Sequence, residues 1–137
     1  MLNLPSCLPG VRNTAEAERN VEKLIDTDTI AGSISYERLD TGSLKSVREF
    51  AAIVASKYPK IDVLINNAGV MATPYNLTED GFESQFAINY LGHFLLTHLL
   101  LPNLKAAGRK SCNARIVNVS SCAHLSGSIN FDDINGK

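Results

Sequence analysis

The stretch Ile61-Asp62-Val63-Leu64-Ile65-Asn66-Asn67-Ala68-Gly69 decides the fold of this chain. Its first five residues form a short apolar run, which predicts a strand covered on both faces, as in a parallel sheet. The amides and small residues that follow tolerate unusual turns and let a ligand approach the backbone closely. Ligands of open α/β sheets bind beyond the carboxyl ends of the strands, so this strand exit is a candidate site. The turn chemistry alone fits a plain tight exit from the strand equally well.

Helices and strands alternate along the rest of the chain, as their apolar periods indicate. In chain order, the predicted elements are a helix from Asn13 to Ile25, a strand over Ser33–Leu39, a helix from Ser43 to Pro59, the strand Ile61–Ile65, a helix over Glu79–Ala107 ended by Gly108, and a strand over Arg115–Ser120. This alternation predicts an α/β fold with a parallel sheet. Residues 1–10 contain two prolines and no period, and we expect them to be irregular.

Capping residues mark the beginnings of two helices. Asn13 and Glu16 have the spacing of a capping box. The long helix is expected to be capped by Asn76 or Thr78. Pro102 lies inside that helix and should bend it or remove one of its hydrogen bonds.

Composition narrows the class of protein. A length of 137 residues suits one domain, and a net charge of −1 without a basic run gives no reason to expect nucleic acid as a partner. No apolar stretch reaches the about 18 residues that span a bilayer, and the N-terminus lacks the basic leader of a signal peptide. Three scattered cysteines predict reduced thiols, and three histidines without a second ligand at metal spacing predict no metal site. We therefore expect a cytoplasmic protein, whose full-length form could still associate with membranes.

Two further positions could carry chemistry. Ser121 follows the last strand, where a serine can meet a bound substrate, although serines at such ends more often cap and turn. Asn89 lies in an otherwise apolar helix segment, where a buried amide is costly unless it is hydrogen-bonded. Asn89 is therefore predicted either to brace a neighbouring backbone or to organise a site.

Three segments, in this order and spacing, resemble the short-chain dehydrogenase/reductase family. They are Asn66-Asn67-Ala68-Gly69, Asn89-Tyr90-Leu91-Gly92-His93-Phe94 and Arg115-Ile116-Val117-Asn118-Val119-Ser120-Ser121. The resemblance covers about Val11 to Lys137, and the ending Phe131-Asp132-Asp133-Ile134-Asn135 is similar to the branch that contains retinol dehydrogenases. We interpret the chain as an N-terminal fragment, roughly the first half, of such a protein.

The resemblance implies a Rossmann-type doubly wound parallel sheet, incomplete in this chain, in an oxidoreductase that uses NAD(P). Residues 11–137 would form a partial NAD(P)-binding domain after a non-family N-terminus at residues 1–10. Asn67, Ala68 and Gly69 would lie against the cofactor, and Asp40 would bond its adenine. Arg12, just past the second strand, favours NADP(H) over NAD(H), because an arginine at this point accommodates the 2′-phosphate.

For catalysis, the resemblance implies that Asn89 holds a water in a proton relay and that Ser121 hydrogen-bonds the substrate oxygen. The expected substrate is a small apolar alcohol or carbonyl of retinoid type. The helix over Glu79–Ala107 is expected to form a homo-oligomer contact.

Two family motifs are absent from these 137 residues: the glycine-rich phosphate loop Gly-x-x-x-Gly-x-Gly and the catalytic Tyr-x-x-x-Lys. The tyrosine is the expected proton donor to the carbonyl oxygen, a role worth about 10²–10⁴-fold in rate. An alternative hypothesis is therefore an inactive truncated or spliced product that acts at most as a partner of family subunits. An unrelated α/β nucleotide binder is disfavoured, since three motifs agree in order.

Overall fold

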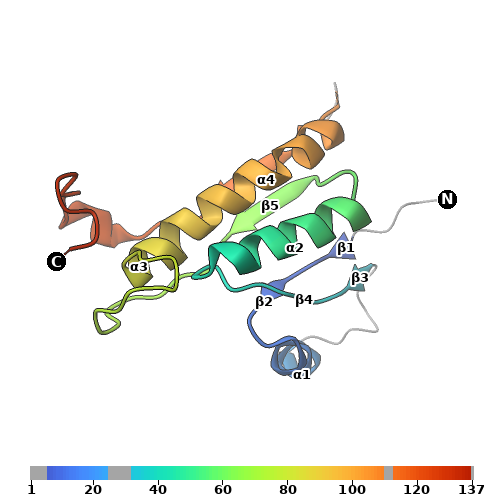
Figure 1. Cartoon of the computed structure of the whole chain (residues 1–137). Helices are drawn as coiled ribbons and strands as arrows, with labels where there is room; N and C mark the ends of the chain where they lie inside the picture. Colours follow the sequence, from blue (N-terminus) through green and yellow to red (C-terminus); the bar gives the residue numbers. More distant parts are fainter. Residues whose placement is uncertain (1–5, 25–31, 110–112, 137) are drawn as a thin grey trace. The chain divides into compact units, whose positions relative to one another are not determined.

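The computed structural model describes residues 6–24, 32–109 and 113–136. The chain divides into two compact units, Met1–Asp40 and Thr41–Lys137. Each combines parallel strands with helices, as Figure 1 shows. The α/β class predicted from the sequence is confirmed, and the sheet is incomplete: the described residues form three separate pairs of strands, whereas a doubly wound fold has one sheet.

Within residues 6–24 and 32–40, the first unit forms four two-residue strands. These are β1 (Ser6–Cys7), β2 (Gly10–Val11), β3 (Ser33–Ile34) and β4 (Glu37–Arg38). β1 pairs with β3 and β2 pairs with β4, both in parallel. The prediction that residues 1–10 are irregular is therefore wrong for the strand residues among them, and residues 1–5 lie outside the described residues.

Pro9 explains why one pair of strands is divided in two. The amides of Ser35, Glu37 and Leu39 donate to the carbonyls of Cys7, Pro9 and Val11 at 3.1, 3.2 and 2.9 Å, so one side of the ladder is continuous. The return bond in a parallel ladder would come from the amide of residue 9, and proline has none. The predicted strand Ser33–Leu39 is thus present but interrupted between β3 and β4.

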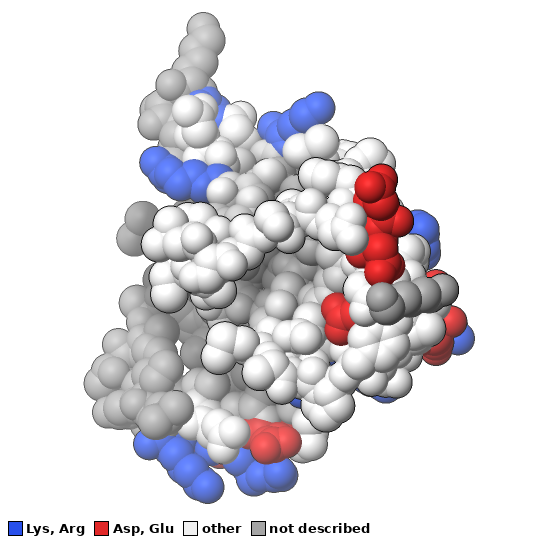
Figure 2. Space-filling view, turned by 90° about the vertical axis from the view of Figure 1, so that its left-hand side faces the viewer, with Lys and Arg blue, Asp and Glu red and all other residues white. Residues whose placement is uncertain are grey.

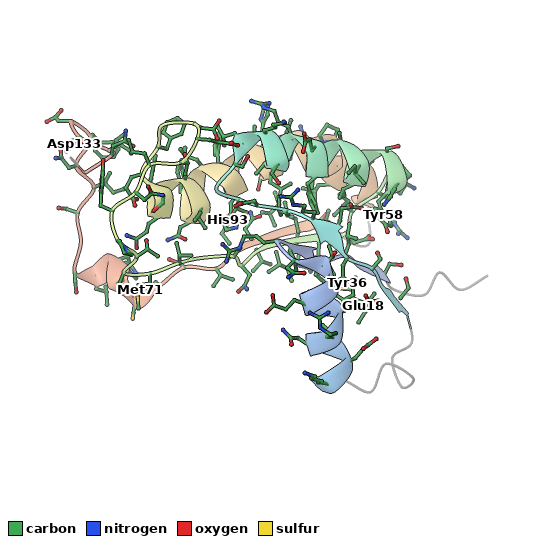
Figure 3. All side chains as sticks on the ribbon, turned by 60° about the horizontal axis from the view of Figure 1, so that its bottom comes forward. Glu18, Tyr36, Tyr58, Met71, His93 and Asp133 are labelled. Carbon is green, nitrogen blue, oxygen red and sulfur yellow. The ribbon has the colours of Figure 1, made fainter. Side chains whose placement is uncertain are left out.

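Helix α1 (Thr14–Leu24) begins as predicted. The Glu16 backbone amide donates to the Asn13 side-chain oxygen at 3.1 Å, which confirms Asn13 as the cap. The Glu16 carboxylate accepts from the side-chain nitrogen of Asn13 at 3.3 Å, where a capping box would use the backbone amide. Ile25, the predicted end of its apolar stripe, lies outside the described residues. In Figure 3, Glu18 lies beside Tyr36 of the strand region. The pKa of Tyr36 is raised by partial burial and then by the negative charge of Glu18.

The second unit contains the other helices and the longest pair of strands. In chain order these are α2 (Leu44–Lys57), β5 (Val63–Asn66), α3 (Ser84–Phe86), the π-helical segment η2 (Ala87–Leu91), α4 (Gly92–Ala107), β6 (Arg115–Asn118) and the 3₁₀ turn η3 (Cys122–Leu125). β5 and β6 pair in parallel, from Val63 opposite Arg115 to Asn66 opposite Asn118.

The core of this unit lies between α2 and α4, which pack against each other. The spacing of apolar residues in the sequence predicts a stripe on α2 from Leu44 to Val54, which is buried apart from the partly buried Leu44. The buried apolar side chains are those of Val47, Phe50, Ala51 and Val54 on α2 and Leu96, Leu100, Leu104 and Ala107 on α4. Asn103 joins the two helices, because its side-chain nitrogen donates to the carbonyl of Tyr58 at 2.8 Å at the end of α2. As predicted, helix α2 follows the cap Ser43 and ends before Pro59.

β5 is not covered on both faces, contrary to the prediction. Val63 and Ile65 are 50% and 60% exposed, whereas Leu64 and Asn66 alternate with them toward α4. The neighbouring Val117 on β6 is also exposed. An apolar run predicts that both faces will be covered in a complete sheet, and among the described residues of the second unit only one face of β5 has helices against it.

The long helix begins later than predicted. Its first residue is Ser84 rather than Glu79, and its cap is Glu83 rather than Asn76 or Thr78. The Glu83 carboxylate accepts from the amides of Gln85 and Phe86 at 2.9 and 2.8 Å. Burial raises the pKa of Glu83. The hydrogen bonds from these amides and from the Ser84 hydroxyl lower this pKa by more than burial raises it, so the net shift is downward. Thr78 instead supports the preceding turn, where its hydroxyl accepts from the Phe82 amide at 3.4 Å.

The helix is also not uniformly α-helical. The amide of Gly92 donates to the carbonyl of Ala87, one residue farther back than in an α-helix, and this wide turn contains Asn89. Such π-turns occur frequently at functional sites. None of the helices within the described ranges is long and apolar enough to cross a bilayer.

Candidate functional site

The carboxyl ends of β5 and β6 lie side by side. Their register places Asn66 opposite Asn118, and the Val119 amide continues the ladder to the carbonyl of Asn66 at 3.0 Å. The segments Asn67–Gly69 and Ser120–Ser121 therefore leave the sheet at the same edge. This is the edge at which open α/β sheets bind ligands.

Asn66 holds this edge together from inside. It is 4% exposed, and its side-chain nitrogen donates to the Asn118 side-chain oxygen at 2.8 Å and to the Thr97 hydroxyl at 3.0 Å. One amide thus links both strand ends to helix α4. Its own side-chain oxygen has no hydrogen-bond partner among the described residues.

Asn89 braces the loop that follows β5. Its side-chain oxygen accepts from the Val70 amide and its nitrogen donates to the Val70 carbonyl, both at 2.9 Å. Of the two roles predicted from the sequence, bracing a neighbouring backbone is confirmed. The prediction of burial is wrong, because Asn89 is exposed. The ring Nδ1 of His93 lies 3.1 Å from the Asn89 carbonyl oxygen.

Ser121 is exposed and caps η3. Its hydroxyl oxygen accepts from the Ala123 amide at 3.2 Å, and its carbonyl lies 2.6 Å from Nδ1 of His124. The structural role expected of a serine at this place is therefore present. An accepting hydroxyl still carries its own proton, so Ser121 can also donate to a second group.

Arg12 and Asp40 belong to the first unit. Arg12 directly follows β2 and Asp40 lies two residues after β4, so both follow the carboxyl ends of paired parallel strands. Arg12 is exposed and Asp40 is partly buried. The structure thus forms two groups of the predicted residues, Arg12 with Asp40 in one unit and Asn67–Gly69 with Asn89 and Ser121 in the other.

Charge is spread thinly over the face in Figure 2. Uncharged residues make up most of the visible surface, and the lysines and arginines lie at separate places near its margin.

Sequence reasoning missed two amides that contact the segments around the site. The Gln85 side-chain oxygen accepts from the Ala72 amide at 3.0 Å, and the Asn135 side-chain oxygen accepts from the Glu83 amide at 2.9 Å. A signal for Gln85 exists in the sequence, since it precedes Asn89 by four residues and so shares its helical face. Asn135 offers no such local signal, because its partner is distant in the chain.

Comparison with known proteins agrees with this architecture. The profile of the family described as short chain dehydrogenase matches residues 8–132. Retinol dehydrogenase 13 from Homo sapiens is 53% identical over 113 residues, which cover 82% of this chain and 33% of that protein. The chain spans about a third of the length of this relative.

Solved structures show the same fold. A protein from Mycobacterium paratuberculosis is 46% identical with a TM-score of 0.74, and the match covers 93% of this chain and 41% of that one. A metagenomic short-chain oxidoreductase in complex with NADP is 26% identical with a TM-score of 0.66, over 85% and 50% of the two chains. With the strand-end site and a profile match over most of its length, the chain belongs to the short-chain dehydrogenase family.

Proposed function

We propose that this chain is the cofactor-binding part of an oxidoreductase that moves a hydride between NADP(H) and an apolar alcohol or carbonyl of retinoid type. The observation that carries the proposal is the shared edge where Asn67–Gly69 and Ser121 leave two paired strands. Relatives named for retinol support the substrate class. The cofactor would supply the hydride, and the protein would orient both reactants.

The residues of the second unit fit these roles. Asn67, Ala68 and Gly69 are exposed, and small side chains there leave the backbone open to a flat ligand. Ser121 would donate its proton to the substrate oxygen while it accepts from Ala123. Both polar atoms of the Asn89 side chain bond the Val70 backbone, and a relay water would be held at the Asn89 backbone carbonyl, beside Nδ1 of His93.

Binding and turnover test the proposal directly. We define the extended protein as these 137 residues joined to the flanking segments of human retinol dehydrogenase 13. We expect it to bind NADPH and to reduce retinal. A protein of the 137 residues alone should do neither, because they contain no glycine-rich loop and no Tyr-x-x-x-Lys. Cofactor fluorescence titration and a reductase assay measure both properties, and an extended protein that binds no NADPH would refute the proposal.

The cofactor preference is tested at Arg12. Arg12→Asp in the extended protein should shift the ratio of kcat/KM for NADPH over NADH by about tenfold or more toward NADH. Arginine pairs with phosphate, whereas aspartate repels it and accepts from a ribose hydroxyl. Arg19→Asp, on the exposed part of α1, is the matched control for charge and should keep the ratio. If Arg12→Asp also leaves the ratio of kcat/KM for NADPH over NADH unchanged, Arg12 does not bind the 2′-phosphate.

A second role for this chain is self-association through the long helix, and an aromatic stripe favours it. Phe86, Tyr90 and Phe94 follow one another on one helical face, with ring centroids 5.4 and 6.0 Å apart. Phe94 is 62% exposed. Exposed aromatic rings are typical of contacts between protein chains. A catalytically inactive form of this chain would then act as a partner of family subunits.

A further inference from the structure

The loop after β5 adopts a conformation that its sequence does not favour. Ala72 has a φ of 54°, in the left-handed region that residues with a Cβ seldom enter. Alanine has no side-chain polar group to stabilise this conformation locally. Something outside the loop must therefore hold the backbone at Ala72.

Two amide side chains of the long helix hold the loop. The Asn89 side chain makes two hydrogen bonds to the backbone of Val70, and the Gln85 side-chain oxygen accepts from the Ala72 amide at 3.0 Å. Val70 and Ala72 are two residues apart, while Gln85 and Asn89 are four apart on one helical face. The helix thus provides the hydrogen bonds that a neighbouring strand would make to an extended segment.

Gln85 is itself fixed in place. Its backbone amide donates to the Glu83 carboxylate at 2.9 Å. The Glu83 amide in turn donates to the side chain of Asn135 at 2.9 Å. The start of the helix is therefore tied to a distant segment of the chain, and Gln85 presents its side chain from a fixed backbone.

Met71 is the residue between the two held positions. It is 81% exposed, the most exposed large hydrophobic side chain among the described residues (Figure 3). A long, flexible and polarizable side chain of this type adapts well to apolar ligands. Its loop leaves the sheet at the edge shared with Ser121. Fixing both neighbours of an exposed apolar residue makes its position reproducible without burying it.

We infer that Met71 determines specificity by contacting the apolar part of the substrate, and that Gln85 is a positioning residue that holds Met71 in place together with Asn89. The inference rests on the proposed function, because it needs a substrate at this strand edge. A long polyene aldehyde would reach Met71 beyond its reacting carbonyl. A short carbonyl compound would depend much less on this contact.

The experiment compares retinal with benzaldehyde as substrates of the extended protein. Met71→Ala should lower the ratio of kcat/KM for retinal over benzaldehyde on the order of tenfold, as loss of one apolar contact does. Gln85→Leu should lower this ratio as well, mainly through a higher KM for retinal, whereas Gln85→Glu keeps an acceptor for the Ala72 amide and should retain the ratio. Leu77→Ala, an exposed apolar residue of the same loop beyond the held positions, is the matched control and should leave the ratio as in the parent.

Amide hydrogen exchange gives a readout that does not depend on turnover. Gln85→Leu should lose the protection of the Ala72 amide, and Gln85→Glu should keep it. Two results would overturn the inference, provided that the parent protein still reduces benzaldehyde. One is an unchanged ratio of kcat/KM for retinal over benzaldehyde in Met71→Ala. The other is a Gln85→Leu protein that keeps both the parental ratio and a protected Ala72 amide. A parent that reduces neither aldehyde overturns the proposed function and, with it, the specificity role of Met71.

Discussion

Replacing Ser121 by alanine in the extended protein is expected to lower kcat by roughly 10²–10³-fold, the loss seen when one positioned donor to a developing oxyanion is removed. The hydroxyl of Ser121 stands at the shared edge of β5 and β6, and the Ala123 amide fixes its orientation at 3.2 Å. An interaction made mainly in the transition state lowers kcat and kcat/KM together. Steady-state kinetics with retinal and NADPH would measure both.

Ser120→Ala is the matched control for this prediction. Ser120 is the exposed neighbour of Ser121 at the same sheet edge, and its hydroxyl is given no role in the reaction. Its replacement should change the barrier by no more than about 0.5 kcal/mol and retain kcat within about twofold. Ser121→Thr keeps a hydroxyl and should recover part of the lost rate. If Ser121→Ala retains the parental kcat while Ser120→Ala loses it, the assignment belongs to the other serine.

Helices with a complete local signal were predictable from the sequence. The stripe on α2 is buried from Val47 to Val54 at each position that the period of three and four residues marks, and its first residue, Leu44, is partly buried. The cap at Asn13 was also predictable, because both partners lie within four residues of each other. Such features depend on neighbours along the chain, so the sequence of one segment contains the information for them.

Features that depend on distant partners were mispredicted. Glu83 rather than Thr78 caps the long helix, and its amide is paired with Asn135, which lies far along the chain. Strand Ile61–Ile65 reads as buried on both faces, yet Val63 and Ile65 are exposed, since burial requires elements that cover the second face. The hydrophobic pattern indicates which side chains are buried in the complete fold. It does not show whether a given chain contains the elements that would cover them.

The order of strands gives a physical reason for the two units. A doubly wound sheet has the order 3-2-1-4-5. By the resemblance, β1 and β2 occupy the second strand, β3 and β4 the third, β5 the fourth and β6 the fifth. The observed pairs are therefore 3-2 and 4-5, and the described residues contain no strand that corresponds to the first. The chain divides at the place where the first strand would join the halves.

The position of the candidate site could be predicted in part. The placement of Asn67–Gly69 and Ser121 at one edge follows from the sequence because parallel strands bring their carboxyl ends together. The function of the Asn89 side chain could be narrowed to two roles but not decided. Its partner, the Val70 backbone, is identified only once the π-turn of η2 has set the direction of the side chain. Gln85 acts on a backbone amide, and such contacts leave no pattern in the partner's sequence.

Gly92→Ala is expected to destabilise the second unit by about 3 kcal/mol or more, at the upper end of what overpacking of a core costs. Gly92 is buried where the long helix passes Thr41. A Cβ on residue 92 would lie 2.9 Å from both the carbonyl carbon and the Cβ of Thr41, and closer still to the Thr41 carbonyl oxygen. Because these are mostly backbone atoms, they cannot turn aside as the end of a flexible side chain would. The helix or the loop before α2 has to move, and the buried contacts of α2 with α4 move with it.

Urea unfolding of the extended protein, followed by circular dichroism, measures this loss of stability. Gly108→Ala is the matched control, because Gly108 has a φ of −58° and a Cβ there would meet its nearest atom, the Lys105 carbonyl oxygen, at an ordinary 3.5 Å. It should change the free energy of unfolding by no more than about 0.5 kcal/mol, as substitutions without steric conflict do. The contrast between the two glycines separates the cost of the Thr41 contact from the general effect of adding a methyl group. Equal stabilities for both variants would mean that the helix does not approach Thr41 as closely as the structure shows.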